Sequence, residues 1–423
     1  MNEDFLYYLW QYQLFFKSAI KTTNQQQISI LKTGTHNKNS GPDFLNAHIK
    51  IDSETWFGNV EMHIKSSDWY VHNHEVDSNY DAVILHVVWE HDVTVFTKEN
   101  QVLPTLELKN FVDKELISKY NNFLYDSKRW IPCENQLETV EPFLIKNWLE
   151  RLYFERLEQK SLVIKDILQH TNFDFEAVLF VLLAKNFGLK VNGDAFLKLA
   201  TSIDYSVVKK VRFDEQQLAA LFFGQAGFLE DDLQEQYHIQ LKKEYDYLRH
   251  KYHLQANHKN YFQFFRMRPP NFPTIRIAQL VSLFHQHQNL FSKVMKLEKK
   301  EDFYSLFSVE VQTFWKTHFT FETESKKSSK KITKSFVDLL LINTIIPLKF
   351  VYLQEKSGFD EETILKLISQ IAPEKNSIID AFSKLKVAPK SALESQALLT
   401  LKNDYCTKKR CLYCAIGNRL LRN

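Results

Sequence analysis

The sequence predicts an α+β protein, in which an N-terminal α/β domain with a mixed sheet precedes a large all-helical region. Between residues 28 and 110, short apolar runs alternate with turn-rich pieces, which is typical of strands. From about residue 113 such runs all but vanish. Segments with helical spacing and alternating charge then continue to the C-terminus.

The order of elements follows from these patterns. Residues 5–18 read as an amphipathic or buried helix, and a long helix is expected in "EPFLIKNWLERLYFERLEQKSLVIKDILQ". The expected strands are "QQISILKTG", "AHIKI", "WFGNVEMHIK", "DAVILHVVWEHD", "VTVF" and "LPTLELK". Because 423 residues exceed one ordinary core, we expect an α/β domain over 1–135, a helical domain over 136–330 and a C-terminal helical segment over 331–423.

Composition narrows the class of protein. The chain is 44% hydrophobic and 25% charged, as a globular protein is, and its net charge of +3 does not decide for or against nucleic acid. Its nine glycines form neither a G-x-x-x-x-G-K-[ST] nor a G-x-G-x-x-G motif. Glu3 and Asp4 argue against a signal peptide, and no membrane helix is expected because no run of about 18 uncharged apolar residues occurs. Four cysteines in so long a chain suggest the cytoplasm.

Two carboxylates suggest a metal site in the N-terminal domain. Gly41-Pro42 predicts a turn, which places Asp43 at or just before a strand. On the next strand, Glu61, His63 and Lys65 share one face because side chains alternate. Asp43 and Glu61 would bind Mg²⁺ or Mn²⁺ through oxygen, while His63 or Lys65 orients water and offsets charge on a phosphodiester. These residues are therefore the candidate catalytic group.

The stretch from 56 to 92 also holds five histidines, and each has an ordinary structural explanation. His86, inside "VILHVV", suits a core histidine with a backbone hydrogen bond, and His91 suits the surface. His72 and His74 lie in an expected loop and share a face only if the strand continues. Together with Asp43, Glu61, Asp77 and Asp81 they suggest a metal or acid–base site instead, and imidazole suits Zn²⁺, Mn²⁺ or Fe²⁺ better than Mg²⁺.

"GPD" followed by "VEMHIK" resembles the PD-(D/E)xK nuclease superfamily. The resemblance implies a nuclease-like N-terminal domain with Asp43 and Glu61 as metal ligands. His63 stands where that signature has lysine. Lys65 lies one pleat further, roughly 6–7 Å along the strand, and could supply the positive charge of that lysine. Lys50 is another candidate for this role. An active site, a degenerate one and a differently built one all remain open.

Nearly the whole chain resembles a bacterial protein family described as a domain of unknown function, which implies no particular activity. The stretches that carry this resemblance are "NEDFLYYLW", "GPDFLNAHI", "GNVEMHIKSSDWYVHNHEVDSNYDAVILHVV", "LPTLEL", "WIPCE", "FGQAGFL", "RMRPPNFPTIR" and "CLYCAIGNRLL".

The cysteines suggest a second centre. Cys406, Cys411 and Cys414 form a C-x4-C-x2-C pattern, and Cys133 lies far earlier in "WIPCE". Four thiolates suit a 4Fe-4S cluster or Zn, and free thiols are the third option. A distant cysteine that closes a C-terminal trio resembles the iron–sulfur staple of some PD-(D/E)xK nucleases, although here it follows the nuclease-like core.

Arginines in "FFRMRPPNFPTIRIAQL" are candidates for nucleic-acid binding. Prolines stiffen this segment, so Arg266, Arg268 and Arg276 could grip phosphates while Phe265 or Phe272 stacks on bases. Alternatively, the arginines cap helices or pair with acids. The lysine-rich piece "ESKKSSKKITKS", residues 324–335, is expected to be a solvated loop or helix entry that could touch phosphate.

These features favour a cytoplasmic, metal-dependent phosphodiesterase. Its expected partner is DNA or RNA, and no membrane association is expected. The first alternative is a binding module for nucleic acid or protein with a degenerate nuclease fold. The second is a His/carboxylate metal hydrolase acting on a small molecule.

Overall fold

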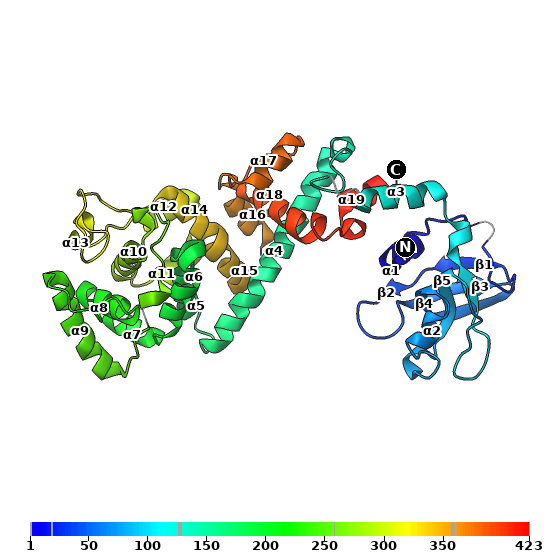
Figure 1. Ribbon diagram of the computed structural model, residues 1–423, viewed down its shortest axis with the longest axis horizontal. Helices are drawn as coiled ribbons and strands as arrows, with labels where there is room; N and C mark the ends of the chain where they lie inside the picture. The colour runs from blue at the N-terminus through cyan, green and yellow to red at the C-terminus, as the bar shows by residue number, and fades with distance from the viewer. Residues whose placement is uncertain (1, 18–19, 126–128, 258, 357–359, 423) are drawn as a thin grey trace. The chain divides into compact units, whose positions relative to one another are not determined.

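The computed structural model describes residues 2–17, 20–125, 129–257, 259–356 and 360–422 (Figure 1). The chain divides into two compact units. The N-terminal unit comprises Met1–Trp148 together with Lys402–Asn423, and the helical unit comprises Leu149–Leu401. This division differs from boundaries near 135 and 330, because the N-terminal unit extends into the first turns of the long helix Pro142–His170 and the C-terminal residues return to the sheet-containing unit.

The N-terminal unit holds one mixed sheet with the strand order β1-β3-β4-β5-β6, and β2 pairs with β3. β3 is antiparallel to its neighbours β1 and β4, whereas β5 and β6 run parallel to β4. This confirms the expected mixed sheet. The strands are β1 (Ile28–Lys32), β2 (Thr35–His36), β3 (Phe44–Ile51), β4 (Glu54–Lys65), β5 (Val83–Glu90) and β6 (Thr105–Glu107).

The alternation of side chains along the strands determines which face becomes the core. On one face of β4, Val60 and Met62 are fully buried, and so is Ile49 of β3. The pairing of β3 with β4 shifts between Phe44 and Ala47, where β3 has one extra residue and β4 keeps its regular alternation. Glu61 and His63 therefore lie on the opposite face from the β4 core residues.

Among the described residues, the α-helices that lie wholly within the N-terminal unit are α1 (Glu3–Tyr12), α2 (Asp68–Val71), α3 (Lys114–Tyr125) and α19 (Ala415–Arg422). α1 and α2 both pack on β4. The helix expected over 5–18 ends earlier, because Gln13 adopts a left-handed conformation that caps α1. The expected strand "VTVF" is absent, and only Phe96 of this segment forms an isolated bridge, with Val102.

The helical unit confirms the large helical region. Its helices often begin at an acidic or amide cap, as at Asp174, whose carboxylate accepts from two backbone N–H groups of α5. Its helices are α4 (Pro142–His170, which starts in the N-terminal unit), α5 (Phe175–Phe187), α6 (Leu189–Thr201), α7 (Tyr205–Val211), α8 (Glu215–Gln225), α9 (Gln236–Tyr252), α10 (Pro273–Gln286), α11 (Leu290–Lys296), α12 (Lys300–Leu306), α13 (Thr313–Thr317), α14 (Lys334–Leu340), α15 (Ile346–Glu355), α16 (Glu361–Ser369), α17 (Ser377–Lys384) and α18 (Ala392–Thr400).

One helical stretch of this unit is long and apolar enough to cross a membrane by length and composition. It covers Lys334–Glu355, where α14 and α15 join through the π-helical turn Leu341–Ile345. Of its most apolar window, 72% is buried inside the protein, which is what a core helix of a helical domain shows.

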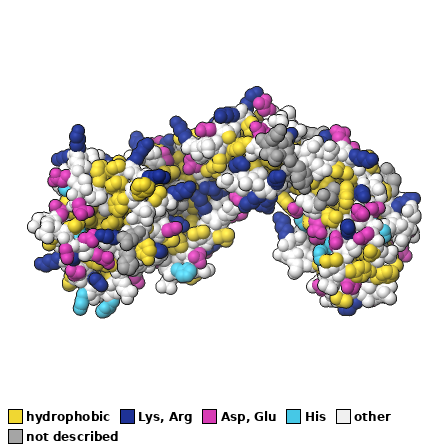
Figure 2. Space-filling model, viewed as in Figure 1, with side chains coloured by type: hydrophobic (Ala, Val, Ile, Leu, Met, Phe, Trp, Pro, Cys, Tyr) yellow, Lys and Arg dark blue, Asp and Glu magenta, His cyan; other side chains and the backbone are white. Residues whose placement is uncertain are grey.

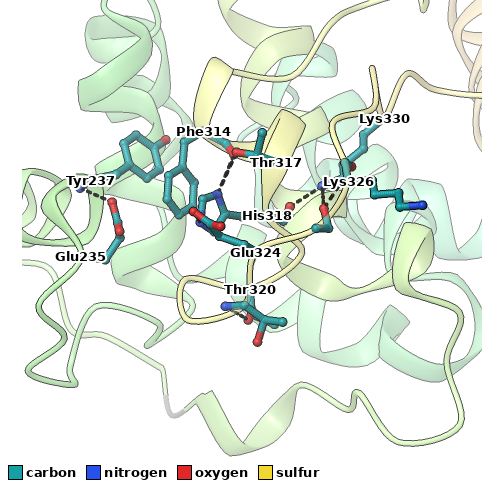
Figure 3. Close-up of polar contacts among 11 residues, drawn as sticks. Glu235, Tyr237, Phe314, Thr317, His318, Thr320, Glu324, Lys326 and Lys330 are labelled. Atoms are coloured by element: carbon teal, nitrogen blue, oxygen red, sulfur yellow. Dashed lines mark hydrogen bonds and ion pairs between the residues drawn. The ribbon is translucent and has the colours of Figure 1, made fainter.

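The lysine-rich segment expected to be solvated is partly fixed to the protein (Figure 3). Lys330 is buried, and its Nζ donates to the His318 carbonyl at 2.5 Å and to Ser325 Oγ at 3.2 Å. Lys331 pairs with Glu310 at 2.9 Å. Lys326 remains exposed. Part of the charge in this segment therefore fastens the loop between α13 and α14.

Candidate metal centre

Asp43 and Glu61 meet where β3 begins beside β4. The Asp43 N–H donates to Glu61 Oε2 at 3.1 Å, and the Met62 N–H donates to Asp43 Oδ2 at 3.0 Å. These two bonds use one oxygen of each carboxylate and fix both side chains. Glu61 Oε1 is left beside the nearby histidines.

Two histidines lie beside the second oxygen of Glu61, and a third lies beside one of them. Glu61 Oε1 lies 3.5 Å from His63 Nε2 and 3.3 Å from His74 Nε2. His63 Nε2 is also 3.1 Å from His72 Nδ1. Each of these histidines offers one nitrogen, and the three nitrogens all lie within 4.8 Å of one another. We call Glu61, His63, His72 and His74 the histidine–carboxylate centre.

The chain brings His72 and His74 to this centre through a short helix. β4 ends at Lys65, and His72 caps the C-terminus of α2. Asn73 then adopts a left-handed conformation, with φ of 58°, which asparagine tolerates better than most residues. The reversal places the His72 and His74 rings 5.4 Å apart, so the strand does not need to continue for both to reach one spot.

Asp92 fixes the start of this short helix. Its Oδ1 accepts from the Ser66 hydroxyl and from the Ser67 N–H, both at 2.9 Å. Its Oδ2 accepts from the Ser67 hydroxyl at 2.8 Å. A residue after β5 therefore anchors the turn that carries His72 and His74.

His86 supports the centre from behind. It is fully buried on β5, directly opposite Glu61 in the strand register, and its Nε2 lies 2.9 Å from His63 Nδ1. Within the described part of the chain, His86 Nδ1 has no hydrogen-bond partner. The expected backbone hydrogen bond of His86 is thus replaced by a contact with His63. If His63 Nδ1 donates to His86, His63 Nε2 keeps its lone pair for a metal ion.

Aromatic and acidic side chains complete the pocket. Tyr7 of α1 donates its hydroxyl to the Asp43 carboxylate, and Glu3 lies close enough to Tyr7 and His72 to interact with both. Tyr80 stacks on His74, with 3.7 Å between ring centroids. His72 is exposed and opens the pocket to solvent. On the visible face of the N-terminal unit, histidine and acidic side chains reach the surface together (Figure 2).

Burial shifts the pKa of the acids and of the imidazoles in opposite directions. It raises the pKa of Asp43 and of Glu61, and the nearness of Glu61 raises that of Asp43 further. Burial and then the neighbouring His86, His74 and His72 lower the pKa of His63 to about 2. Burial likewise lowers the pKa of His86 to about 3. The imidazoles are therefore neutral, and a divalent cation would remove the repulsion between the carboxylates.

The donor set decides which metals fit. Three imidazole nitrogens and one carboxylate oxygen suit Zn²⁺, Mn²⁺ or Fe²⁺, whereas Mg²⁺ prefers oxygen ligands throughout. The three histidine nitrogens lie within 4.8 Å of one another, so one ion could bond to all three at about 2.0–2.2 Å, with Glu61 Oε1 beside two of them. The residues present therefore fit a transition-metal ion better than the magnesium expected from the two carboxylates.

Neither candidate lysine replaces the cation of the nuclease signature inside this pocket. Lys65 follows His63 on the same face but is exposed at the end of β4. Lys50 lies opposite Thr55, near the far end of β3. At about 3.3 Å per residue it is roughly 20 Å along the sheet from Glu61, so Lys50 is not a stand-in.

Tyr7 and Glu3 were not predicted as site residues, and His72 and His74 were expected to lie in a loop. The signal present in the sequence was the His-x-His pair shortly after the Glu-x-His of the strand. Asp77, which was expected to contribute to a metal or acid–base site, instead caps the turn Ser78–Tyr80. Its carboxylate accepts a hydrogen bond from the Asn79 N–H.

The three arginines that were predicted to bind nucleic acid differ in their exposure to solvent. Arg276 is buried, its guanidinium donates to Gln279 and Asn271, and it lies 3.7 Å from the centroid of the Phe336 ring. Its two terminal nitrogens therefore bond to amide side chains inside the helical unit, and not to acids. Arg266 and Arg268 are exposed.

All four cysteines lie in the N-terminal unit as free thiols, because Lys402–Asn423 folds back onto it. Cys133, Cys411 and Cys414 are buried, and Cys406 is partly buried. No cysteine belongs to the histidine–carboxylate centre, whose residues come from another part of the sequence.

Comparison with known proteins gave one family. Neither the curated proteins nor the solved structures contain a match to the chain. A family model described as "Protein of unknown function (DUF2851)" matches residues 3–377. Since that match covers most of its length, the chain belongs to this family of proteins of unknown function.

Proposed function

We propose that the N-terminal unit is a metal-dependent phosphodiesterase that cleaves nucleic acid and prefers Mn²⁺ or Zn²⁺ to Mg²⁺. The observation that carries the proposal is the convergence of His63, His72 and His74 within reach of a single ion, with Glu61 beside His63 and His74. A second carboxylate, Asp43, is held beside them without being needed as a ligand. The proposal also uses the resemblance of Pro42-Asp43 and Glu61-Met62-His63 to the PD-(D/E)xK signature.

An ion at this centre would polarise a phosphoryl oxygen and supply a nucleophile at neutral pH by acidifying water. Glu61 and the three histidines would hold it. His86, through its contact with His63 Nδ1, keeps the His63 ring oriented. The ordered ligands need no rearrangement when charge develops on the phosphate, which is how preorganised sites lower a barrier.

Asp43 is placed to move a proton. Its Oδ2 is fixed by the Met62 N–H, so Oδ1 is the oxygen that could accept a proton from the attacking water. Burial and Glu61 raise the pKa of Asp43 toward neutrality, where a general base works best. Tyr7 donates to the same carboxylate and keeps it aimed into the pocket.

Exposed side chains on the sheet face that carries Glu61 suggest the substrate class. Because β4 alternates regularly, Phe57 lies on that face, about 13 Å along the strand from Glu61. Phe57 is 72% exposed and stacks on His48 at 3.9 Å. Lys32 is opposite His48 in the register, and both Lys32 and Lys50 are exposed. Exposed rings for bases beside lysines for phosphates suit a nucleic-acid strand.

A second candidate is a nucleic-acid or protein-binding module without turnover. The observation that favours it is the histidine at position 63, where the resembling nucleases have lysine. In that case the metal ion would only stabilise the fold, and nucleic acid would bind without being cut.

The test is cleavage by the full-length protein. Single- and double-stranded DNA and RNA, and a small phosphodiester, are incubated with Mn²⁺, Zn²⁺ or Mg²⁺. We expect cutting with Mn²⁺ or Zn²⁺, reduced at least ~100-fold in Asp43→Asn and His74→Ala, since a lost general base alone costs that much. His170→Ala, which removes an exposed imidazole of α4, is the matched control and should cut normally.

The other outcomes separate the alternatives. Salt-dependent binding of nucleic acid without cutting would favour the second candidate. Hydrolysis of the small phosphodiester alone would indicate a small-molecule hydrolase. Cleavage that survives both Asp43→Asn and His74→Ala would place the active site elsewhere.

A further inference from the structure

The C-terminal residues carry three cysteines back to the segment that holds the fourth. Lys402 places its ammonium 5.2 Å from the centroid of the Trp130 ring, three residues before Cys133. Tyr405, next to Cys406, packs edge-on against Trp148 at 5.5 Å. Trp148 also lies beside the sulfur of Cys414. Contacts on both sides therefore join the two segments within the N-terminal unit.

The four sulfurs face a common region. Cys133, Cys411 and Cys414 are buried free thiols, and Cys406 is partly buried. Cys406 lies within electrostatic range of the other three, and Cys411 within range of Cys133 and Cys414. Each sulfur is thus within electrostatic reach of others from both segments. Buried thiols from two distant segments, brought near one another, are the donor set of a thiolate-bound ion or cluster.

The backbone around Cys414 is arranged to serve a sulfur ligand. Cys411 and Cys414 are joined by a tight turn, in which the Cys414 N–H donates to the Cys411 carbonyl at 3.2 Å. The backbone N–H groups of Ile416 and Gly417, at the start of α19, donate to the Cys414 sulfur. A Cβ at Gly417 would lie 2.4 Å from the Cys411 carbonyl oxygen, so only glycine permits this close turn. Hydrogen bonds to sulfur stabilise a metal-bound thiolate.

We propose that Cys133, Cys406, Cys411 and Cys414 hold a [4Fe–4S] cluster that fastens the C-terminal segment to the N-terminal unit. The spacing of the sulfurs favours this cluster over a single zinc ion. With bonds of about 2.3 Å, tetrahedral zinc draws its four sulfurs to roughly 3.8 Å from one another. Among the described residues, however, the group with ligand atoms within 4.8 Å is the histidine trio, and no three of the cysteines meet that limit.

A four-iron cluster places its own sulfides between the ligands and so accepts sulfurs that are farther apart. Two ferric, two ferrous and four sulfide ions carry a charge of plus two, and four thiolates bring minus four as the thiols release four protons. No further oxidant or reductant is needed. Because the ligands are distant in the chain, the bound cluster restricts the unfolded state and stabilises the fold.

The test is metal and sulfide analysis of full-length protein purified without oxygen, with reconstitution by ferric and ferrous iron plus sulfide. We expect about four irons and four acid-labile sulfides per chain and a brown colour. Cys133→Ser and Cys414→Ser should each lose at least ~5-fold of the iron and sulfide. His74→Ala is the matched control, because it alters the other centre and should keep the cluster.

Folding of the variants is checked by circular dichroism and gel filtration. If a serine variant fails to fold, the iron and sulfide content of the wild-type protein alone decides whether the cluster is present. Colourless wild-type protein with one zinc and no sulfide would overturn the cluster, and so would metal-free protein that takes up no iron with sulfide. Unchanged iron and sulfide in folded Cys133→Ser would also overturn it. None of these results depends on nucleic-acid cleavage.

Discussion

Replacing His86 with leucine tests whether the histidine–carboxylate centre is positioned from behind. The His86 side chain is fully buried and lies outside bonding reach of the proposed ion, so His86→Leu removes the 2.9 Å contact with His63 without removing a ligand. Leucine fills most of the space and carries no polar atom. The variant therefore isolates the orientation of the His63 ring.

The size of the effect follows from that contact. His63 is buried, so without His86 its Nδ1–H loses its acceptor, at a cost of about 1–3 kcal/mol. At about 1.4 kcal/mol per factor of ten, this corresponds to roughly 5- to 150-fold in affinity. Loss of an outer partner of a ligating histidine typically costs about 10–100-fold in metal affinity. The two estimates agree, and we expect Mn²⁺ to bind His86→Leu about 10–100-fold more weakly.

The assay is isothermal titration of chelator-treated protein with Mn²⁺, repeated in competition with Zn²⁺. His170→Ala serves as the control and should bind as the wild type does. A folded His86→Leu protein with a dissociation constant within about 3-fold of the wild-type value would refute the positioning role, because even the low end of the estimate exceeds that change.

Four further predictions concern other residues. Asp92→Ala should weaken Mn²⁺ binding about 10-fold by releasing the start of α2, as measured by the same titration. Phe57→Ala should raise the KM for nucleic acid several-fold with little change in kcat, since a stacked base contributes about 1–3 kcal/mol. Gly417→Ala should lower the melting temperature and the iron content together, because its Cβ meets the Cys411 carbonyl. Burial lowers the pKa of Lys160 to about 7 from 10.5, so the unfolded chain binds a proton in that interval that the folded chain lacks. Stability should therefore rise with pH between these values, and Lys160→Met should flatten the rise in a thermal melt at successive pH values.

The sequence allowed the sheet and the approach of Asp43 to Glu61 to be predicted, since both follow from local rules. Gly41-Pro42 requires a turn, and alternation along β4 fixes the faces of Glu61 and His63. The same rules placed Lys50 too close to the site, because they say nothing of how far along a neighbouring strand a residue lies.

The remaining parts of the centre depend on packing between distant segments. His72 and His74 arrive through a four-residue helix and the left-handed Asn73, and neither has a periodic signal in the sequence. Tyr7 reaches Asp43 only because α1 packs on β4. The buried state of Arg276 likewise depends on partners such as Phe336, which come from another helix. Contacts of this kind are set by the tertiary structure.

Anomalous diffraction from crystals grown with Mn²⁺, recorded above and below the manganese absorption edge, tests the histidine–carboxylate centre most directly. The account predicts one strong manganese peak about 2.0–2.3 Å from one nitrogen each of His63, His72 and His74, beside the Glu61 and Asp43 carboxylates. A crystal that contains manganese only at other positions, or none at this pocket at saturating Mn²⁺, would contradict it.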